Sequence, residues 1–112
     1  TEERANLFGQ LQQEIQQQAI DDALEAIQNS NLAHLDEAIG RAEKAGASGM
    51  WIDLLKGRRD LANGKWELAI DHFENSIAAD KDSIAPRANL ILAYAHDHQV
   101  DNFLQGRNKP NV

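Results

Sequence analysis

The spacing of the apolar residues constrains this chain most, because it follows the period of an α-helix along most of its length. Apolar side chains recur at steps of three and four residues, whereas no segment of useful length alternates at period two. Turns of three to five residues interrupt the pattern. Such short turns require neighbouring helices to lie antiparallel. The sequence therefore predicts an all-α protein built of helical hairpins.

Five helices and one short helical turn are predicted from this pattern and from residues that start or end helices. Gly46 and Gly64 suit the left-handed conformation that closes a helix, and Pro86 suits a first helical turn. The expected ranges are 3–29, 32–45, 49–62, 66–79 and 84–97, with a further turn near 100–104. The first range is the longest, so a long N-terminal helix is expected.

The charge of the chain narrows the classes of partner. Its 112 residues carry a net charge of −7, and the only basic cluster is Lys56-Gly57-Arg58-Arg59. Nucleic acid is not an expected partner, because phosphate binding requires a basic face. Membrane insertion is not expected either, since no run of 18 apolar residues is present, and no signal peptide is visible. The compartment stays open between cytoplasm and periplasm, because the absence of cysteine suits both.

Candidate chemical sites are few, and none has the spacing that catalysis or metal binding requires. His96 and His98 are the most site-like pair, but side chains on a helix rotate by about 100° per residue, so the two imidazoles diverge. The paired acids at 36–37 and 80–82 suit helix starts and turns. No glycine-rich phosphate loop and no serine with a base at motif spacing is present. We therefore expect a non-enzymatic protein with no catalytic residue, cofactor or metal.

One stretch carries an ordered series of small and aromatic residues. It runs Gly57-(x6)-Gly64-x-Trp66-x-x-Ala69-(x3)-Phe73-(x2)-Ser76. Small side chains at 57, 69 and 76 would let antiparallel helices approach closely, while Phe73 would fill the space against the next hairpin. The stretch resembles the tetratricopeptide repeat, whose 34-residue unit would run from 50 to 83. The resemblance covers residues 32–98 and is closest over 50–95.

The resemblance implies one domain divided into repeat units. Residues 36–39 look like residues 67–70, but they lie 31 rather than 34 positions earlier, so the first unit is expected to be degenerate. The expected single domain over 1–112 comprises an N-terminal helix over 1–30, a degenerate half-repeat over 32–49, the best repeat over 50–83, a partial repeat over 84–105 and a tail over 106–112. Repeats of this family stack into a right-handed superhelix with a concave groove, which is the fold that we expect.

The resemblance also implies where a partner binds. In this family the first helix of each hairpin lines the groove, where a peptide or helix would meet a hydrophobic floor with Arg58 and Asn89 as polar anchors. The implied groove positions are Trp51, Leu54, Leu55, Arg58, Asn89, Leu92 and His96. The implied function is that of an adaptor or scaffold domain whose partner is another protein or peptide.

Other interpretations stay open on the sequence alone. The long N-terminal helix could mediate self-association, which would make the chain an oligomerisation module and its partner a second copy in a homodimer. The chain could instead be a small dedicated chaperone for one hydrophobic subunit. The helix over 3–29 could also fill the groove and place Trp51 in the core. For the basic cluster, we expect solvation or pairing within the chain in preference to an acidic partner.

Overall fold

The described part of the chain is a row of four helices. The computed structural model describes residues 1–84, 86, 87, 89 and 93. These residues contain no strand, and their helices are α1 (Glu2–Gln28), α2 (Leu32–Lys44), α3 (Gly49–Ala62) and α4 (Trp66–Ala79). The all-α prediction is confirmed, and each boundary of these four helices lies within one residue of the prediction. Leu92, His96 and most of the expected partial repeat and tail fall outside the described residues.

Capping residues set the ends of the helices. Three N-cap side chains accept a hydrogen bond from the backbone N–H three residues on, and these are Thr1, Asn31 and Ser48. After α2 and α3, Gly46 and Gly64 adopt φ angles of 79° and 73°, as the sequence predicts for residues that close helices. Ser30 takes the same left-handed conformation after α1, with φ at 56°. Short turns with local hydrogen bonds thus fix where each helix stops.

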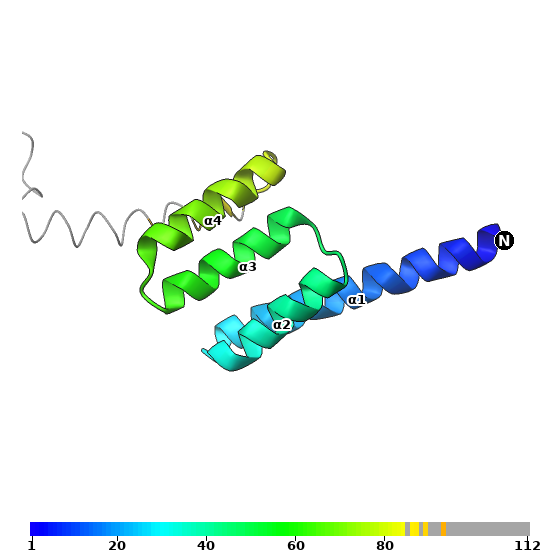
Figure 1. The fold of residues 1–112 in the computed structure, drawn as a ribbon, viewed down its shortest axis with the longest axis horizontal. Helices are drawn as coiled ribbons and strands as arrows, with labels where there is room; N and C mark the ends of the chain where they lie inside the picture. Colours follow the sequence, from blue (N-terminus) through cyan, green and yellow to red (C-terminus); the bar gives the residue numbers. More distant parts are fainter. Residues whose placement is uncertain (85, 88, 90–92, 94–112) are drawn as a thin grey trace, which may run out of the picture.

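The helices form two antiparallel hairpins, α1 with α2 and α3 with α4 (Figure 1). The core of the first hairpin contains Ala23, Ala26, Leu35, Ala38 and Ile39, together with Leu55. The core of the second contains Leu54, Ala69, Ile70, Phe73 and Ala93. Because α3 supplies Leu54 to one cluster and Leu55 to the other, it joins the two hairpins through neighbouring side chains.

The close approach of α3 to α4 depends on Gly57. A Cβ atom at this position would lie 2.6 Å from Cδ1 and 2.8 Å from Cζ of Phe73, whose ring is fully buried. Only glycine therefore leaves room for the ring. Near the other end of the hairpin, the buried Ser76 hydroxyl donates to the Met50 carbonyl at 2.6 Å. The small residues expected at the seam of the second hairpin thus lie where its helices approach closely.

The backbones of the two hairpins repeat with a shift of 34 residues. The first helix of each hairpin ends at 28 and 62, and the second begins at 32 and 66. In the connecting turns, Asn29 and Asn63 share the backbone angles φ −91° and ψ 2°. Each is followed by the left-handed residue, Ser30 or Gly64. A backbone hydrogen bond across five residues closes each turn, from N–H 31 to the carbonyl of 26 at 2.9 Å and from N–H 65 to the carbonyl of 60 at 2.8 Å.

Burial largely follows the same 34-residue shift in α1 and α3, and partly follows it in α2 and α4. The buried positions 20, 23 and 26 of α1 correspond to 54, 57 and 60 of α3, and the buried positions 35, 39 and 42 of α2 correspond to 69, 73 and 76 of α4. The resemblance of 36–39 to 67–70 instead corresponds to a shift of 31 residues, which also fits the burial of the second helices, because the buried positions 38, 39, 42 and 45 then match 69, 70, 73 and 76. At the shift of 34, residues 16–49, which we call the first unit, correspond to residues 50–83, the second unit.

The first half of α1 extends beyond the end of α2 (Figure 1). Residues 1–11 are all exposed. The side-chain amides of Gln12 and Gln16 donate to the Ala45 carbonyl at 2.6 and 2.8 Å, beside the end of α2. The predicted long N-terminal helix is therefore present, but only its second half belongs to the hairpin.

Candidate partner-binding groove

A hollow of about 780 Å³, which we call the groove, lies between α1 and α3. From α1 and its following turn it is lined by Asp21, Leu24, Glu25, Ile27, Gln28 and Asn29. From the rest of the chain it is lined by Trp51, Leu54, Leu55, Arg58 and Asn89. Its volume lies in the range of about 300–1,000 Å³ that is common for ligand sites in proteins.

Five of the seven groove positions implied by the sequence lie together in this hollow. The four on α3 are spaced at three- and four-residue steps, which places them along one side of that helix. Leu54 and Leu55 form its floor, with exposures of only 4% and 0%. Leu92 and His96, the two remaining positions, lie outside the described residues.

Trp51 takes part both in the groove and in the core. Its side chain is half-buried and packs against the core cluster that contains Leu54 and Phe73. It also lines the groove. In the described part of the chain, α1 does not cover it completely, because the buried residues of α1 pack mainly against α2. The long first helix therefore forms a wall of the groove rather than its filling.

Charged side chains are arranged unequally around the groove. Arg58 projects from α3, and its Nη1 donates to Oδ1 of Asn89 at 3.0 Å. On the α1 wall, Asp21 and Glu25 lie one helical turn apart and are both exposed. The Asp21 carboxylate accepts a hydrogen bond from the Gln17 side chain at 2.9 Å. The groove thus combines an apolar floor, one guanidinium and an acidic wall.

The rest of the basic cluster joins the two hairpins. Nζ of Lys56 lies 3.1 Å from Oε2 of Glu43, and Nη1 of Arg59 lies 3.4 Å from Oδ1 of Asp36. Both acidic partners belong to α2 and not to the acidic first helix. The structure therefore uses Lys56 and Arg59 for pairing within the chain, which leaves Arg58 as the groove-lining member of the cluster.

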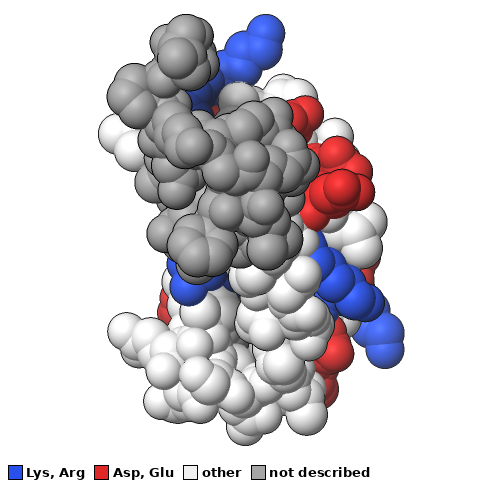
Figure 2. Space-filling view, turned by 90° about the vertical axis from the view of Figure 1, so that its left-hand side faces the viewer, with Lys and Arg blue, Asp and Glu red and all other residues white. Residues whose placement is uncertain are grey.

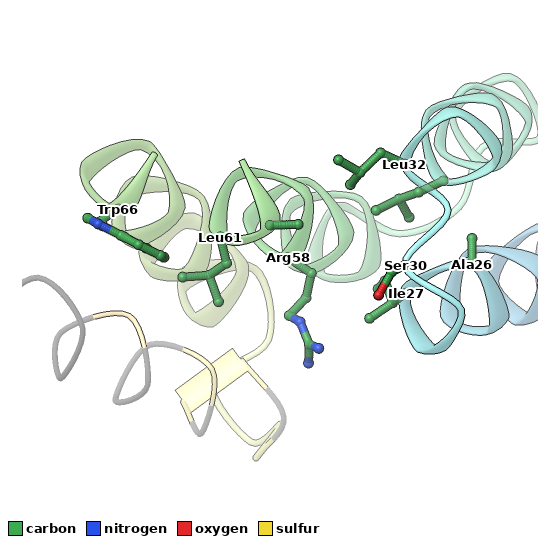
Figure 3. A pocket seen from close by; sticks show the side chains of 9 residues that line it. Ala26, Ile27, Ser30, Leu32, Arg58, Leu61 and Trp66 are labelled. Carbon is green, nitrogen blue, oxygen red and sulfur yellow. The ribbon is translucent and has the colours of Figure 1, made fainter. Parts of the chain in front are cut away.

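A second hollow of about 460 Å³ adjoins the groove and shares Ile27 and Arg58 with it. Figure 3 shows Ile27, Ser30 and Leu32 on one side of this hollow, with Arg58 and Leu61 on the other. It opens near the α1–α2 turn, where residues 26–35 carry no Asp, Glu, Lys or Arg. The surface at the bottom of Figure 2 is largely uncharged. The sequence did not predict this hollow, because its residues come from the ends of both hairpins and share no spacing.

A polar contact between α3 and α4 was also not predicted. Nδ1 of His72 lies 3.2 Å from Oδ1 of Asp53, and its Nε2 lies 3.5 Å from Oδ2 of Asp60. Asp60 is only 4% exposed, and its Oδ2 has no hydrogen-bond partner within the described residues. The imidazole therefore lies between two carboxylates, each facing a different ring nitrogen. Among all residues that the structure describes, no three His, Cys, Asp or Glu side chains are grouped so that they could hold a metal ion.

Comparisons of the chain with models of protein families, with curated proteins and with solved structures found no match. Among the helices that the structure describes, none is both long and apolar enough to cross a membrane. The inference of function therefore rests on the residues of the groove.

Proposed function

We propose that the chain is a protein-binding module of the tetratricopeptide type, which holds a peptide or helix of another protein in the groove. The observation that carries this proposal is the matching spacing of the two walls. Both helices line the groove with side chains at steps of three, one and three residues. They are Asp21, Leu24, Glu25 and Gln28 on α1, and Trp51, Leu54, Leu55 and Arg58 on α3, and Ile27 of α1 also lines the groove. Because α1 and α3 run in the same direction (Figure 1), these side chains border a continuous channel.

The 34-residue shift between the hairpins supports the same proposal. It equals the unit length of the tetratricopeptide family, and α3 contacts both helices of the first hairpin. Repetition of this arrangement produces a superhelix whose first helices line its inner surface. Pro86, Arg87, Asn89 and Ala93 are helical, and Asn89 lines the groove, as expected for the first helix of a third unit.

The side chains of the groove favour a particular class of partner. The floor at Leu54 and the indole of Trp51 suit apolar side chains. Asp21 and Glu25 on the opposite wall suit a Lys or Arg residue next to them. The net charge of −7 would attract a basic segment over a longer distance. The expected partner is thus an amphipathic segment with apolar and basic residues, and no catalytic step, cofactor or metal is part of the proposal.

Peptide selection tests the proposal directly. Peptides from a random display library are selected on the full chain, and the affinity of a selected peptide is then measured for two matched variants by titration calorimetry. Leu24→Gln changes a groove residue that is 40% exposed, and Leu68→Gln changes a residue of α4 that is 49% exposed and does not line the groove. The first should weaken binding about tenfold, and the second should leave it unchanged.

Two outcomes would contradict the proposal. One is equal binding by the wild-type chain and Leu24→Gln, which would place the peptide elsewhere. The other is selection of peptides without basic residues, together with unchanged binding by Asp21→Asn/Glu25→Gln, which would remove the role of the acidic wall. Dissociation over hours rather than seconds would instead indicate a dedicated chaperone that shields its ligand.

A further inference from the structure

The projecting half of α1 carries an apolar stripe that nothing in the described part of the chain covers. The stripe consists of Leu7, Phe8, Leu11 and Ile15, which are exposed by 65%, 71%, 54% and 47% respectively. Their spacing places them on one side of the helix. All four lie in residues 2–15, which precede the first repeat unit and have no counterpart in the second.

A partner would stabilise this segment as a helix. Residues 1–11 are exposed on every side, so within the described chain they are supported only by their continuity with the packed half of α1. Gly9 weakens the segment further, because glycine loses more backbone freedom in a helix than other residues do. Close packing does not require glycine at this position, because no atom lies within 4 Å of where a Cβ atom would be. Burial of the stripe against another apolar surface would stabilise the segment further.

The distribution of charge points to a second copy of the chain as that partner. Glu14 is the only charged residue between positions 5 and 20, whereas the whole chain carries −7. Two copies of so acidic a chain repel each other over most of their surfaces. The stripe is the apolar surface that two copies can bring together with least repulsion. Its flanks are glutamines, which are uncharged and can donate and accept hydrogen bonds across a pair of helices.

Another helical hairpin, stacked on the outer side of α1 and α2, is a less suitable partner for the stripe than a second copy of the chain. Nη2 of Arg41 lies 2.9 Å from Oδ2 of Asp22, and its Nε lies 2.7 Å from Oε1 of Glu37. These ion pairs lie on the side of α2 away from Asp36 and Glu43, which pair with α3. A hairpin stacked there would have to cover the ion pairs.

We propose that two copies of the chain pair along this stripe as antiparallel helices. The middle of the stripe is Leu11, so a twofold axis beside it makes Leu11 face its own counterpart. Leu7 of one copy then faces Ile15 of the second copy. A symmetric dimer of this kind uses the same surface on both chains.

Charge and shape favour the antiparallel direction. The Glu3 side chains of the two copies would lie about 24 Å apart, from 16 residues at about 1.5 Å each, well beyond a screening length of about 8 Å in physiological salt. A parallel pair would bring Glu2 and Glu3 of both copies together and would align the two helix dipoles. The antiparallel pair also points the two hairpins in opposite directions, with the N-terminus of each copy beside residue 21 of the other.

The size of the stripe predicts a reversible dimer. The four side chains expose roughly 400 Å² per copy, or about 800 Å² in the pair, whereas stable interfaces bury about 1,200–2,000 Å². The stems of the flanking glutamines add to this area. The dimer is therefore expected to dissociate on dilution in the micromolar range.

Sedimentation velocity of the full chain over a roughly hundredfold range of concentration tests the pairing. The wild-type chain should change from monomer to dimer across this range. Leu11→Glu, which places two carboxylates face to face at the axis, should shift the midpoint at least tenfold towards higher concentration. Gln13→Glu is the matched control, because it adds the same charge on the opposite side of the same helix and should change little. A wild-type chain that stays monomeric throughout, or a dimer that Leu11→Glu leaves intact, would overturn the proposal.

The register is tested by charge reversal and by cross-linking. A mixture of Leu11→Glu and Leu11→Lys should recover the dimer that neither variant forms alone, because position 11 meets its own counterpart. The chain has no cysteine, so single cysteines report proximity without background. Leu11→Cys should form a disulfide-linked dimer readily, whereas Arg4→Cys, on the same side of the helix but about 21 Å from its counterpart, should not. Equal cross-linking at both positions would indicate a parallel pair and would overturn the antiparallel register.

Discussion

The two hairpins share one backbone period but fill it with different side chains. In the second hairpin, the large ring of Phe73 packs against Gly57. The positions 34 residues earlier hold Ile39 and Ala23, both buried in the core of the first hairpin. A larger residue therefore faces glycine, and a smaller one faces alanine. The comparison shows that the spacing between helices depends on the combined volume at the seam and not on either residue alone.

A second pair of corresponding positions differs in polarity. Asp60 and His72 lie on the seam of the second hairpin, where the first hairpin has Ala26 and Ala38, exposed by 1% and 0%. The same backbone thus accepts either two methyl groups or a carboxylate beside an imidazole. Because a buried carboxylate is costly without a partner, the polar version depends on both residues, whereas the apolar version does not.

The largest expected loss of stability comes from adding a methyl group at the seam of the second hairpin. Gly57→Ala should lower the free energy of unfolding by about 2–3 kcal/mol, because the new methyl group overlaps the Phe73 ring. Urea denaturation followed by circular dichroism measures this change. Gly40→Ala is the control, since nothing lies within 4 Å of its Cβ position in α2, and it should instead stabilise the helix by up to about 1 kcal/mol.

Copying the first hairpin into the second then sharpens the comparison. Gly57→Ala/Phe73→Ile reproduces the pair found at 23 and 39, so it should be more stable than Gly57→Ala alone. A double variant that is less stable than Gly57→Ala would show that the two seams are not equivalent.

A smaller effect is expected from the polar contact. His72→Ala should lower the free energy of unfolding by about 1–2 kcal/mol, because it leaves the buried carboxylate of Asp60 without its imidazole neighbour. Asp60→Ala/His72→Ala reproduces the apolar pair of the first hairpin and should recover most of this loss. A double-mutant cycle measures the coupling, and two additive single effects would contradict it.

The left-handed residues of the two turns, Ser30 and Gly64, can also be exchanged between the hairpins. Ser30→Gly should raise the free energy of unfolding by about 0.5–1 kcal/mol, because glycine adopts a φ of 56° without a Cβ penalty. Gly64→Ser should lower it by a similar amount at the corresponding position. Thermal unfolding of both variants checks the pair, and changes of the same sign would argue against equivalent turns.

The smallest effect concerns an ion pair of the first hairpin. The hydrogen bond from Arg41 holds the pKa of Asp22 below its ordinary value, and a hydrogen bond from Gln18 adds to this lowering. The stabilisation is present at pH values above the ordinary pKa of aspartate, and it is lost as the pH falls through the lowered pKa. Asp22→Asn should therefore be slightly less stable than the wild-type chain at pH 7 and equal to it in strong acid. Denaturation at a series of pH values tests this, and a constant difference would show that the ion pair is not responsible.

Local patterns were sufficient for the helices, but not for every contact between them. Ser48 and the two left-handed glycines mark helix boundaries through hydrogen bonds within a few residues, so these boundaries were predictable. The grouping of Trp51, Leu54, Leu55 and Arg58 along one side of α3 was also predictable, because they follow one helical face. The shift of 34 residues between the two hairpins was not predictable, because it became visible only from the matching turns and from the buried positions of α1 and α3.

The sequence by itself determined that this chain forms antiparallel helices, where the four described helices begin and end, and that small residues lie at the seam of the second hairpin; it placed Phe73 against the next hairpin, whereas the structure packs the ring against Gly57. Tertiary structure alone decided that Asp21 and Glu25 oppose Arg58 across a groove, that His72 lies between two carboxylates, and that half of α1 projects with its apolar stripe uncovered. The physical reason is the range of the interactions. Caps and helical periods act within about one or two turns, whereas the neighbours of a side chain on another helix depend on how the hairpins stack.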